Sequence, residues 1–159
     1  SQRPEKLLST IRSRCQIVPF IRLNNNEVNK IIDKLEHSDE INNIHPDKKR
    51  ELIKLSYGSP GQYLINLQYW LSISNPLKQQ LEVLSANHIE LLKLAKEVTE
   101  ELNIEQQLWL IDFQQNKAWE KGKNSNVVKK YEELRRQLLK YVQPRLAWEV
   151  ILLEINSID

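Results

Sequence analysis

The chain has 159 residues, of which 40% are hydrophobic and 28% are charged, and its formal net charge is +2. This length and balance suit one ordinary domain or two small ones and argue against global disorder. Only three glycines occur, where average usage gives about eleven. Glycine scarcity disfavours hairpin-rich β folds and predicts a mainly helical chain. It also excludes a glycine-rich phosphate loop.

The positive charge is concentrated near the first residue. Residues 1–22 carry five basic side chains and one acidic one, a net charge of +4, whereas residues 23–75 and 76–159 each carry −1. We therefore expect a partner bearing phosphate or carboxylate near residues 1–22, and no nucleic-acid-coating surface along the whole chain. The lone Cys15 excludes an intramolecular disulfide and indicates a reduced, intracellular setting. Because the chain starts at Ser1, we expect it to be a piece of a longer protein.

Two short elements are predicted within residues 1–22. Apolar residues at helical spacing follow Pro4 and predict a short helix. Residues 15–20 are β-branched and short, and they predict a strand that has no neighbouring strand in this chain. Because an unpaired strand leaves its backbone groups unsatisfied, we expect its sheet to lie in an upstream part of the protein.

Three helices are predicted over residues 23–74. The first is capped near Asn24 and shows a helical apolar period. The second spans residues 47–56 with Gly58 as its C-cap, and the third spans residues 59–72 with Pro60 in its first turn. The residues expected to be buried are Val28, Ile31, Ile32, Leu35, Leu52, Ile53, Leu55, Leu64, Leu67, Trp70 and Leu71.

A boundary is predicted at Asn75-Pro76, which has the form of an N-cap followed by a helix-starting proline. Four or five longer helices then fill residues 76–159 and predict a second helical bundle. The apolar residues assigned to its helices are Leu77, Leu81, Leu84, Ile89, Leu92, Val98, Leu102, Leu108, Ile111, Trp119, Val127, Val128, Tyr131, Leu134, Leu138, Leu146, Ala147, Val150 and Leu153. No apolar run is long enough for a membrane span, and no signal peptide opens the chain.

Most catalytic patterns are missing. The histidines, His37, His45 and His88, lack metal-ligand spacing, and surface or capping roles are expected for them. The four tryptophans lie on predicted helices, where core packing is a simpler role than base stacking. The basic residues 129–140 alternate with Glu132 and Glu133, so helical ion pairing accounts for them without nucleic acid.

One segment carries a more specific signal: Leu7-Leu8-Ser9-Thr10-Ile11-Arg12-Ser13-Arg14-Cys15-Gln16-Ile17. It resembles the Ser-Arg-Cys segment of clamp-loader AAA+ subunits, in particular those of the bacterial DNA polymerase III delta-prime family. The resemblance implies that Arg14, flanked by Ser13 and Cys15, is an arginine finger inserted in trans into a neighbouring subunit's ATP site. Such a guanidinium stabilises charge on the transferred phosphoryl group. The simpler alternative is that Arg14 caps a short helix, and Arg12 is a second candidate for the role.

A second motif, Gly58-Ser59-Pro60-Gly61, resembles the start of the sensor-2 helix in the same family. In the ATP-hydrolysing relatives an arginine follows Gly-Ser after one residue, and the matching position here is Gly61. Glycine has no side chain to contact phosphate, so the resemblance implies a non-hydrolysing subunit. The two glycines also serve as a helix C-cap and a turn.

The segment Gln143-Pro144-Arg145-Leu146-Ala147-Trp148-Glu149 is similar to the last helix of the clamp-loader collar. Together the resemblances imply an all-α chain with three parts: the tail of an AAA+ ATPase core with a remnant strand (1–22), a three-helix lid (23–74) and a helical collar (75–159). They imply no cofactor bound by this chain, ATP and magnesium on the neighbouring subunit, and no enzymatic activity of the chain alone within the DNA polymerase III holoenzyme. The implied partners are other loader subunits in a cytoplasmic hetero-oligomeric ring, with the sliding clamp and primed DNA contacted indirectly.

Two alternatives stay open from the sequence. The chain is also compatible with the C-terminal part of an active clamp-loader ATPase of the gamma/tau type, which an intact upstream phosphate-binding loop would identify. It is also compatible with a helical nucleic-acid-binding module that uses the basic residues 1–22 and its tryptophans. Binding that weakens steeply with salt would identify that module.

Overall fold

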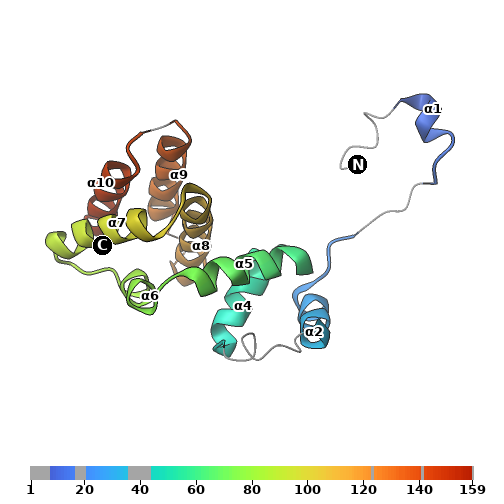
Figure 1. Ribbon diagram of the computed structural model, residues 1–159, viewed down its shortest axis with the longest axis horizontal. Coiled ribbons are helices and arrows are strands. Elements are labelled where there is room, and N and C mark those ends of the chain that lie inside the picture. Colours follow the sequence, from blue (N-terminus) through green and yellow to red (C-terminus); the bar gives the residue numbers. More distant parts are fainter. Residues whose placement is uncertain (1–7, 17–20, 36–43, 123, 141, 159) are drawn as a thin grey trace.

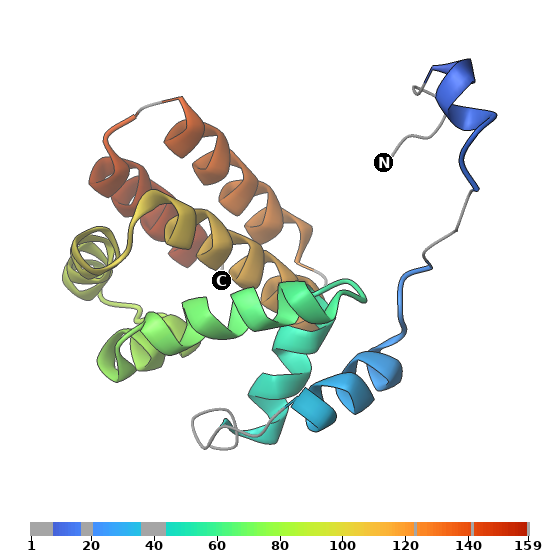
Figure 2. The same ribbon diagram turned by 45° about the vertical axis from the view of Figure 1, so that its right-hand side comes forward.

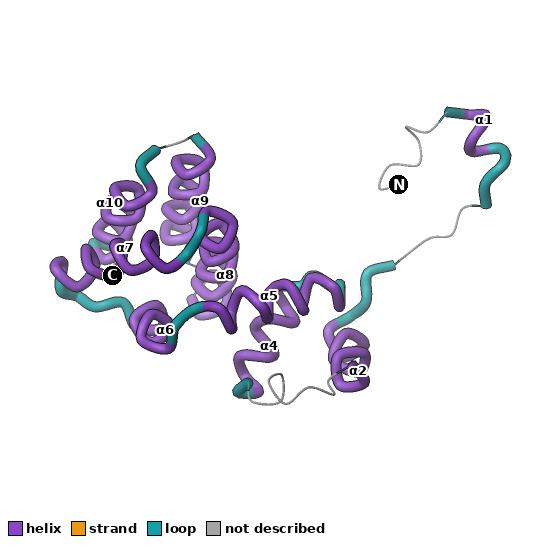
Figure 3. The backbone as a smooth tube through the Cα atoms, viewed as in Figure 1, coloured by secondary structure: helices purple, strands orange, loops and turns teal. Residues whose placement is uncertain are grey.

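The computed structural model describes residues 8–16, 21–35, 44–122, 124–140 and 142–158, and these residues form helices and connecting turns without a strand (Figure 3). The predicted all-α class is confirmed. The helices are α1 (Ser9–Arg12), α2 (Asn25–Leu35), α4 (Pro46–Leu55), α5 (Pro60–Ser72), α6 (Asn75–Glu82), α7 (His88–Glu101), α8 (Ile104–Gly122), α9 (Ser125–Leu139) and α10 (Pro144–Asn156).

The predicted strand is not seen in the part of it that the structure describes. Cys15 forms a bend and Gln16 has no regular structure, while residues 17–20 lie outside the described residues. A strand needs a neighbour to pair its backbone groups, and none is present among the described residues. In both Figure 1 and Figure 2 the short helix α1 lies well apart from the other helices.

Helix starts follow the capping chemistry that the sequence encodes. Asn24 and Glu27 form a reciprocal capping box, with hydrogen bonds of 3.0 and 2.8 Å from backbone nitrogens to side-chain oxygens. Asn124 is the N-cap of α9, where its side chain accepts a hydrogen bond from the Val127 nitrogen. The cap predicted at Asn75 lies one residue earlier: the Ser74 hydroxyl accepts from the Leu77 nitrogen, and Asn75 is already helical.

Helices α2, α4 and α5 pack on one another and form what we call the first helical group. Val28 and Ile32 of α2 are buried as predicted, together with Leu52 and Leu55 of α4. The buried face of α5 agrees with the prediction at Leu67 and Trp70 and differs from it elsewhere. It consists of Tyr63, Asn66, Leu67 and Trp70, whereas Leu64 and Leu71, which were expected in the core, are 37% and 43% exposed.

Helices α6 to α10 form the second helical group, in which α10 packs against α7 and α9, and α8 packs against α9. Its core includes Leu94, Ile111, Leu134 and Trp148. Several residues assigned to the core are instead exposed because their helices bury a neighbouring stripe. They are Ile89 (64%), Leu92 (37%), Trp119 (54%), Leu146 (52%) and Val150 (40%).

The two groups share one hydrophobic core. Helices α4 and α5 of the first group both pack on α8 of the second group, so α8 joins the two groups. Only Ile73 and Ser74 separate α5 from α6, and Ile73 is buried. The predicted boundary near residue 75 therefore coincides with a change of helix but not with a break in packing. The assignment of the segments to ATPase tail, lid and collar stays a prediction.

Candidate functional site

The Ser-Arg-Cys segment follows directly after α1. The backbone nitrogen of Ser13 donates to the Ser9 carbonyl at 3.0 Å, and its hydroxyl donates to the Thr10 carbonyl at 3.2 Å. Ser13, Arg14 and Cys15 are all exposed, and the Cys15 thiol is free. No ion pair of Arg14 is found in the part of the chain that the structure describes. The side chain of Arg12 lies outside the described residues.

The Gly58 turn requires glycine for two reasons. Gly58 has φ +80°, the left-handed region that favours glycine. A Cβ at this position would also collide with the carbonyl oxygen of Leu23 and approach its nitrogen to 3.0 Å. The Leu23 nitrogen donates to the Gly58 carbonyl at 3.3 Å. The turn thus holds the segment before α2 against the start of α5. Tyr57, before it, has φ 49° and is mostly exposed.

Gly61, at the position matched to the sensor-2 arginine, lies in the first turn of α5. The nearest atom to a Cβ there would be the Ser59 hydroxyl, 4.0 Å away. The backbone at Gly61 is ordinary, with φ outside the left-handed region. The backbone at this position therefore has room for a side chain, but the residue here is glycine.

The same turn borders a cleft of about 550 Å³ that lies between the first helical group and α8. Its lining residues include Arg22, Tyr57, Gly58, Ser59, Gln62, Asn66, Trp109 and Asp112. Asn66, which is buried, accepts hydrogen bonds from Gln62 Nε2 and Trp109 Nε1, each at 3.1 Å. Asp112 is ion-paired with Arg135. These polar groups are therefore already engaged. No sequence pattern connects Asn66, Trp109 and Asp112, because they are far apart in the chain.

Helix α10 is apolar on two faces. Its inner face, which includes Trp148, Ile151 and Leu152, is completely buried. Its outer face carries Leu146 and Val150, which are half exposed, and Leu153, which is half buried. We call Leu146, Val150 and Leu153 the outer α10 face. Exposed apolar side chains that lie together on one helix face mark interaction surfaces, so this face is a candidate contact surface.

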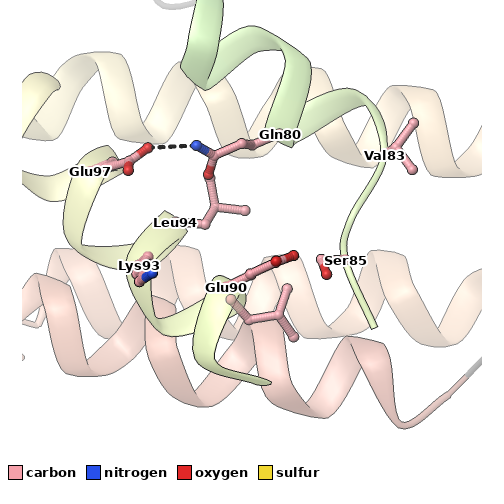
Figure 4. Close-up of a pocket in the computed structure, with 8 residues that line it drawn as sticks. Gln80, Val83, Ser85, Glu90, Lys93, Leu94 and Glu97 are labelled. Carbon is pink, nitrogen blue, oxygen red and sulfur yellow. Dashed lines mark hydrogen bonds between the residues drawn. The ribbon is translucent and has the colours of Figure 1, made fainter. Parts of the chain in front are cut away.

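A further cavity of about 310 Å³ lies between α6 and α7 and contains no residue predicted for function. Figure 4 shows Glu97 hydrogen-bonded to Gln80, with Leu94 between α6 and α7 and Glu90 near Ser85. The hydrogen bond measures 2.8 Å.

No cluster of side chains that could hold a metal ion is found in the described part of the chain. His45 is the N-cap of α4, as expected of a capping histidine, and His37 lies outside the described residues.

In the part of the chain that the structure describes, most tryptophans are buried and several basic side chains of α9 are ion-paired. Trp70, Trp109 and Trp148 are buried, which leaves Trp119 as the exposed tryptophan. On α9, three basic side chains are paired with carboxylates: Lys130 with Glu133 and Glu154, Arg135 with Asp112 and Glu132, and Arg136 with Glu132. Bases need exposed aromatic rings and unpaired cations, so the observations favour the packing and pairing roles predicted from sequence.

The described residues define an all-α helical domain with a left-handed turn at Gly58. A family model described as cyanobacterial DNA polymerase III delta prime, C-terminal domain, matches residues 26–155. The chain belongs to this family and is therefore part of a subunit of the DNA polymerase III clamp loader. The matched residues include Gly58 and Gly61 but not Ser13, Arg14 or Cys15.

No curated protein and no solved structure matches the chain. Among the described residues, no helix combines the length and apolar character that a membrane span needs.

Proposed function

We propose that this chain is the C-terminal portion of a clamp-loader subunit that does not hydrolyse ATP. In this role, the second helical group is a collar that holds the subunit in a hetero-oligomeric ring. Arg14 reaches the ATP and magnesium bound by a neighbouring subunit and stabilises charge during phosphoryl transfer. The first helical group corresponds to the AAA+ lid. The complete loader places a sliding clamp on primed DNA in the cytoplasm, and this chain contributes to it through its neighbours.

The outer α10 face is the observation that carries the assembly role. Leu146 and Val150 are 52% and 40% exposed although they belong to a helix whose opposite face is packed in the core. Exposed apolar side chains grouped on one helix face are typical of contact surfaces between subunits. Leu153, half buried on the same face, extends the surface along the helix.

Two features support the non-hydrolysing role and the arginine finger. Gly61 offers no charge at the position where hydrolysing relatives carry arginine, although the local backbone leaves room for a side chain. This favours a delta-prime-like subunit over a gamma/tau-like ATPase. Arg14 is exposed, as a residue that acts on another subunit has to be.

The test of assembly is a double substitution on the outer α10 face, Leu146→Glu with Val150→Glu, in the full-length subunit. Two carboxylates on this face would have to be desolvated in an interface, so we expect the subunit to leave the reconstituted loader complex on size exclusion. The fold should persist, because neither side chain is in the core.

The matched control is Val83→Glu, which places a carboxylate on another apolar residue, one that is 78% exposed and not on α10. This variant should assemble like the wild type. Normal assembly of the α10 double variant, with its helix content intact by circular dichroism, would contradict the proposed role of this face.

A further inference from the structure

A pocket of about 310 Å³ lies where α6, α8, α9 and α10 meet, and the proposed function does not use it. We call it the α8–α9 pocket, and its lining residues include Leu84, Ala118, Gly122, Val127 and Tyr131. Its lining residue on α10 is Ile155, which belongs to the buried face of that helix. The pocket is therefore separate from the outer α10 face.

The walls of the α8–α9 pocket favour an apolar occupant. Gln114 Nε2 donates to the Leu81 carbonyl at 3.2 Å, and Lys117 Nζ donates to the Glu82 carbonyl at 3.3 Å. The Asn124 side chain caps α9. Because these polar groups are engaged, a polar ligand group would be desolvated in the pocket without a partner. The volume is at the low end of ligand pockets, roughly 300–1,000 Å³, and suits one inserted side chain better than a cofactor.

Trp119 provides a second apolar contact beside these lining residues in the sequence. It lies in the same turn of α8 as Ala118 and Gly122, and it is 54% exposed. Tryptophan is among the residues most enriched at the centres of protein interfaces, because its large ring buries much apolar area. The last turns of α8 therefore combine an exposed tryptophan with residues that line an apolar pocket.

Positive charge is concentrated around the same turn. Residues 113–130, which contain the end of α8 and the start of α9, carry five lysines and one glutamate, a net charge of +4. The other residues of the segment 76–159 carry seven basic and twelve acidic side chains, a net charge of −5. A local excess of this sign attracts acidic ligands.

The carboxylates next to the pocket are already neutralised within the chain. Glu120, the single acidic residue of 113–130, pairs with Lys54 of α4 at 2.8 Å. Glu82, which lines the pocket, pairs with Lys48 at 3.3 Å. Among the five lysines, Lys130 is itself paired with carboxylates of α9 and α10. An excess of positive charge is still left for an incoming ligand.

We propose that the α8–α9 pocket and Trp119 form a docking site for an acidic peptide segment of a partner protein. The segment inserts one apolar side chain into the pocket, packs a second against Trp119, and places its carboxylates near the lysines of residues 113–130. This site is additional to the outer α10 face, so a subunit held in a ring through that face still presents it.

Single-stranded nucleic acid is the other polyanion that lysines and a tryptophan attract. Binding of a strand uses several aromatic rings for successive bases, and Trp119 is the one exposed tryptophan among the described residues. A base in the pocket would also leave its hydrogen-bonding edge unpaired, because Gln114 and Asn124 are engaged. An apolar side chain has no such loss, so the observations favour a peptide.

The test uses the full chain and a fluorescein-labelled synthetic peptide of four aspartates followed by leucine and phenylalanine. Fluorescence anisotropy at low salt should show saturable binding that weakens as salt screens the charges. One analogue has asparagines in place of the aspartates, and a second has serines in place of leucine and phenylalanine. Each lacks one of the two proposed interactions, so we expect each to bind at least about tenfold more weakly.

A pair of neighbouring substitutions tests the pocket. Leu84→Glu places a carboxylate in the pocket wall, where it opposes both the apolar side chain and the acidic residues of the peptide, and should weaken binding at least about tenfold. The matched control is Val83→Glu, which adds the same charge one residue earlier. Val83 is 78% exposed and lines the cavity between α6 and α7 instead (Figure 4), so this variant should bind like the wild type.

A second pair tests the charge. Lys121→Gln with Lys123→Gln removes two of the five lysines, so it should weaken binding and reduce its dependence on salt. Lys30→Gln with Lys34→Gln removes the same charge from exposed positions of α2, far along the chain from the pocket. This control should leave the affinity unchanged.

Should Leu84→Glu lose its helical circular dichroism, Trp119→Ala serves instead, because Trp119 is exposed. Absence of binding, equal binding of the asparagine analogue, or unchanged affinity of the folded Leu84 or Trp119 variant would overturn the proposal. Tighter binding of a single-stranded oligothymidylate that the same variants weaken would assign the site to nucleic acid and also overturn it. Since the isolated chain is used, none of these outcomes depends on assembly of the loader.

Discussion

Asn66 of α5 accepts a hydrogen bond from the indole nitrogen of Trp109 on α8, at 3.1 Å, and both side chains are buried. The same Asn66 oxygen accepts a second bond, from Gln62 on its own helix. A polar side chain in the core is tolerated when its groups are satisfied, and it costs stability when they are not. The pair therefore joins the two helical groups beneath the cleft near the Gly58 turn.

Asn66→Ala should destabilise the chain, because the Trp109 indole then has no acceptor in the core. We expect a loss of about 1–3 kcal/mol in the free energy of unfolding, the usual effect of leaving one buried donor unsatisfied. Urea titration followed by circular dichroism measures it. Gln68→Ala is the control on the exposed side of the same helix and should change the free energy little. Equal stability of the two variants would contradict the structural role of the Asn66–Trp109 pair.

The two glycines of the Gly58-Ser59-Pro60-Gly61 motif should respond in opposite ways to alanine. Gly58→Ala forces a Cβ against the Leu23 carbonyl at φ +80°, and the left-handed backbone alone costs about 1–2 kcal/mol. We expect a lower midpoint of thermal unfolding. Gly61→Ala, whose Cβ would meet only the Ser59 hydroxyl at 4.0 Å, should be neutral or stabilising by up to about 1 kcal/mol. An unchanged midpoint for Gly58→Ala would show that the turn relaxes without cost.

Local patterns were sufficient to predict the helices of residues 23–158 and many of their caps. Val28 and Ile32 are buried as the helical period predicts, and Asn124 caps α9. These features depend on residues within one turn of each other, since capping and periodicity are local properties. For the same reason the motif around Gly58 could be assigned to a turn from sequence, and the turn agrees with its left-handed φ.

The choice of buried face on α5 could not be predicted in the same way. Leu64 and Leu71 are apolar but partly exposed, whereas Asn66 is polar but buried. Asn66 can be buried because Trp109, which lies far along the chain, donates a hydrogen bond to it. A hydrophobic pattern within one helix contains no information about such a partner. The contacts of Lys48 with Glu82 and with the ring of Trp70 were missed for the same reason, because in the sequence Lys48 looks like an ordinary charge on an exposed helix face.

Arg14→Ala in the full-length subunit should lower the clamp- and DNA-stimulated ATPase of the assembled loader. In the proposed arrangement, removal of an arginine finger slows phosphoryl transfer at the neighbouring site, an effect of about 10³ to 10⁵ at that site in arginine-finger enzymes. Assembly should be normal on size exclusion, because Arg14 is exposed and lies outside the core. Arg136→Ala, on an exposed part of α9, is the control for loss of a positive charge. Full stimulated ATPase of the Arg14 variant would contradict the arginine finger.

Tyr131 should make the stability of the chain sensitive to alkaline pH. Burial raises the pKa of its phenol above the ordinary value of 10.0, because the ionised form is poorly solvated in the core. In the unfolded chain the phenol ionises near its ordinary pKa while the folded chain still keeps the proton. The contribution of Tyr131 is therefore fully present below pH 10 and decreases as the pH rises above it, by about 1.4 kcal/mol per pH unit.

Urea unfolding of the wild type and of Tyr131→Phe at several values between about pH 9 and about pH 11 tests this linkage. Phenylalanine cannot ionise, so the variant should lose less stability over this range than the wild type does. Tyr57→Phe is the matched control, because it removes a phenol that is 64% exposed and lies outside the core. Parallel pH profiles for the wild type and Tyr131→Phe would mean that the phenol is hydrated in the folded state, and the core around α9 would then have to open to water at alkaline pH.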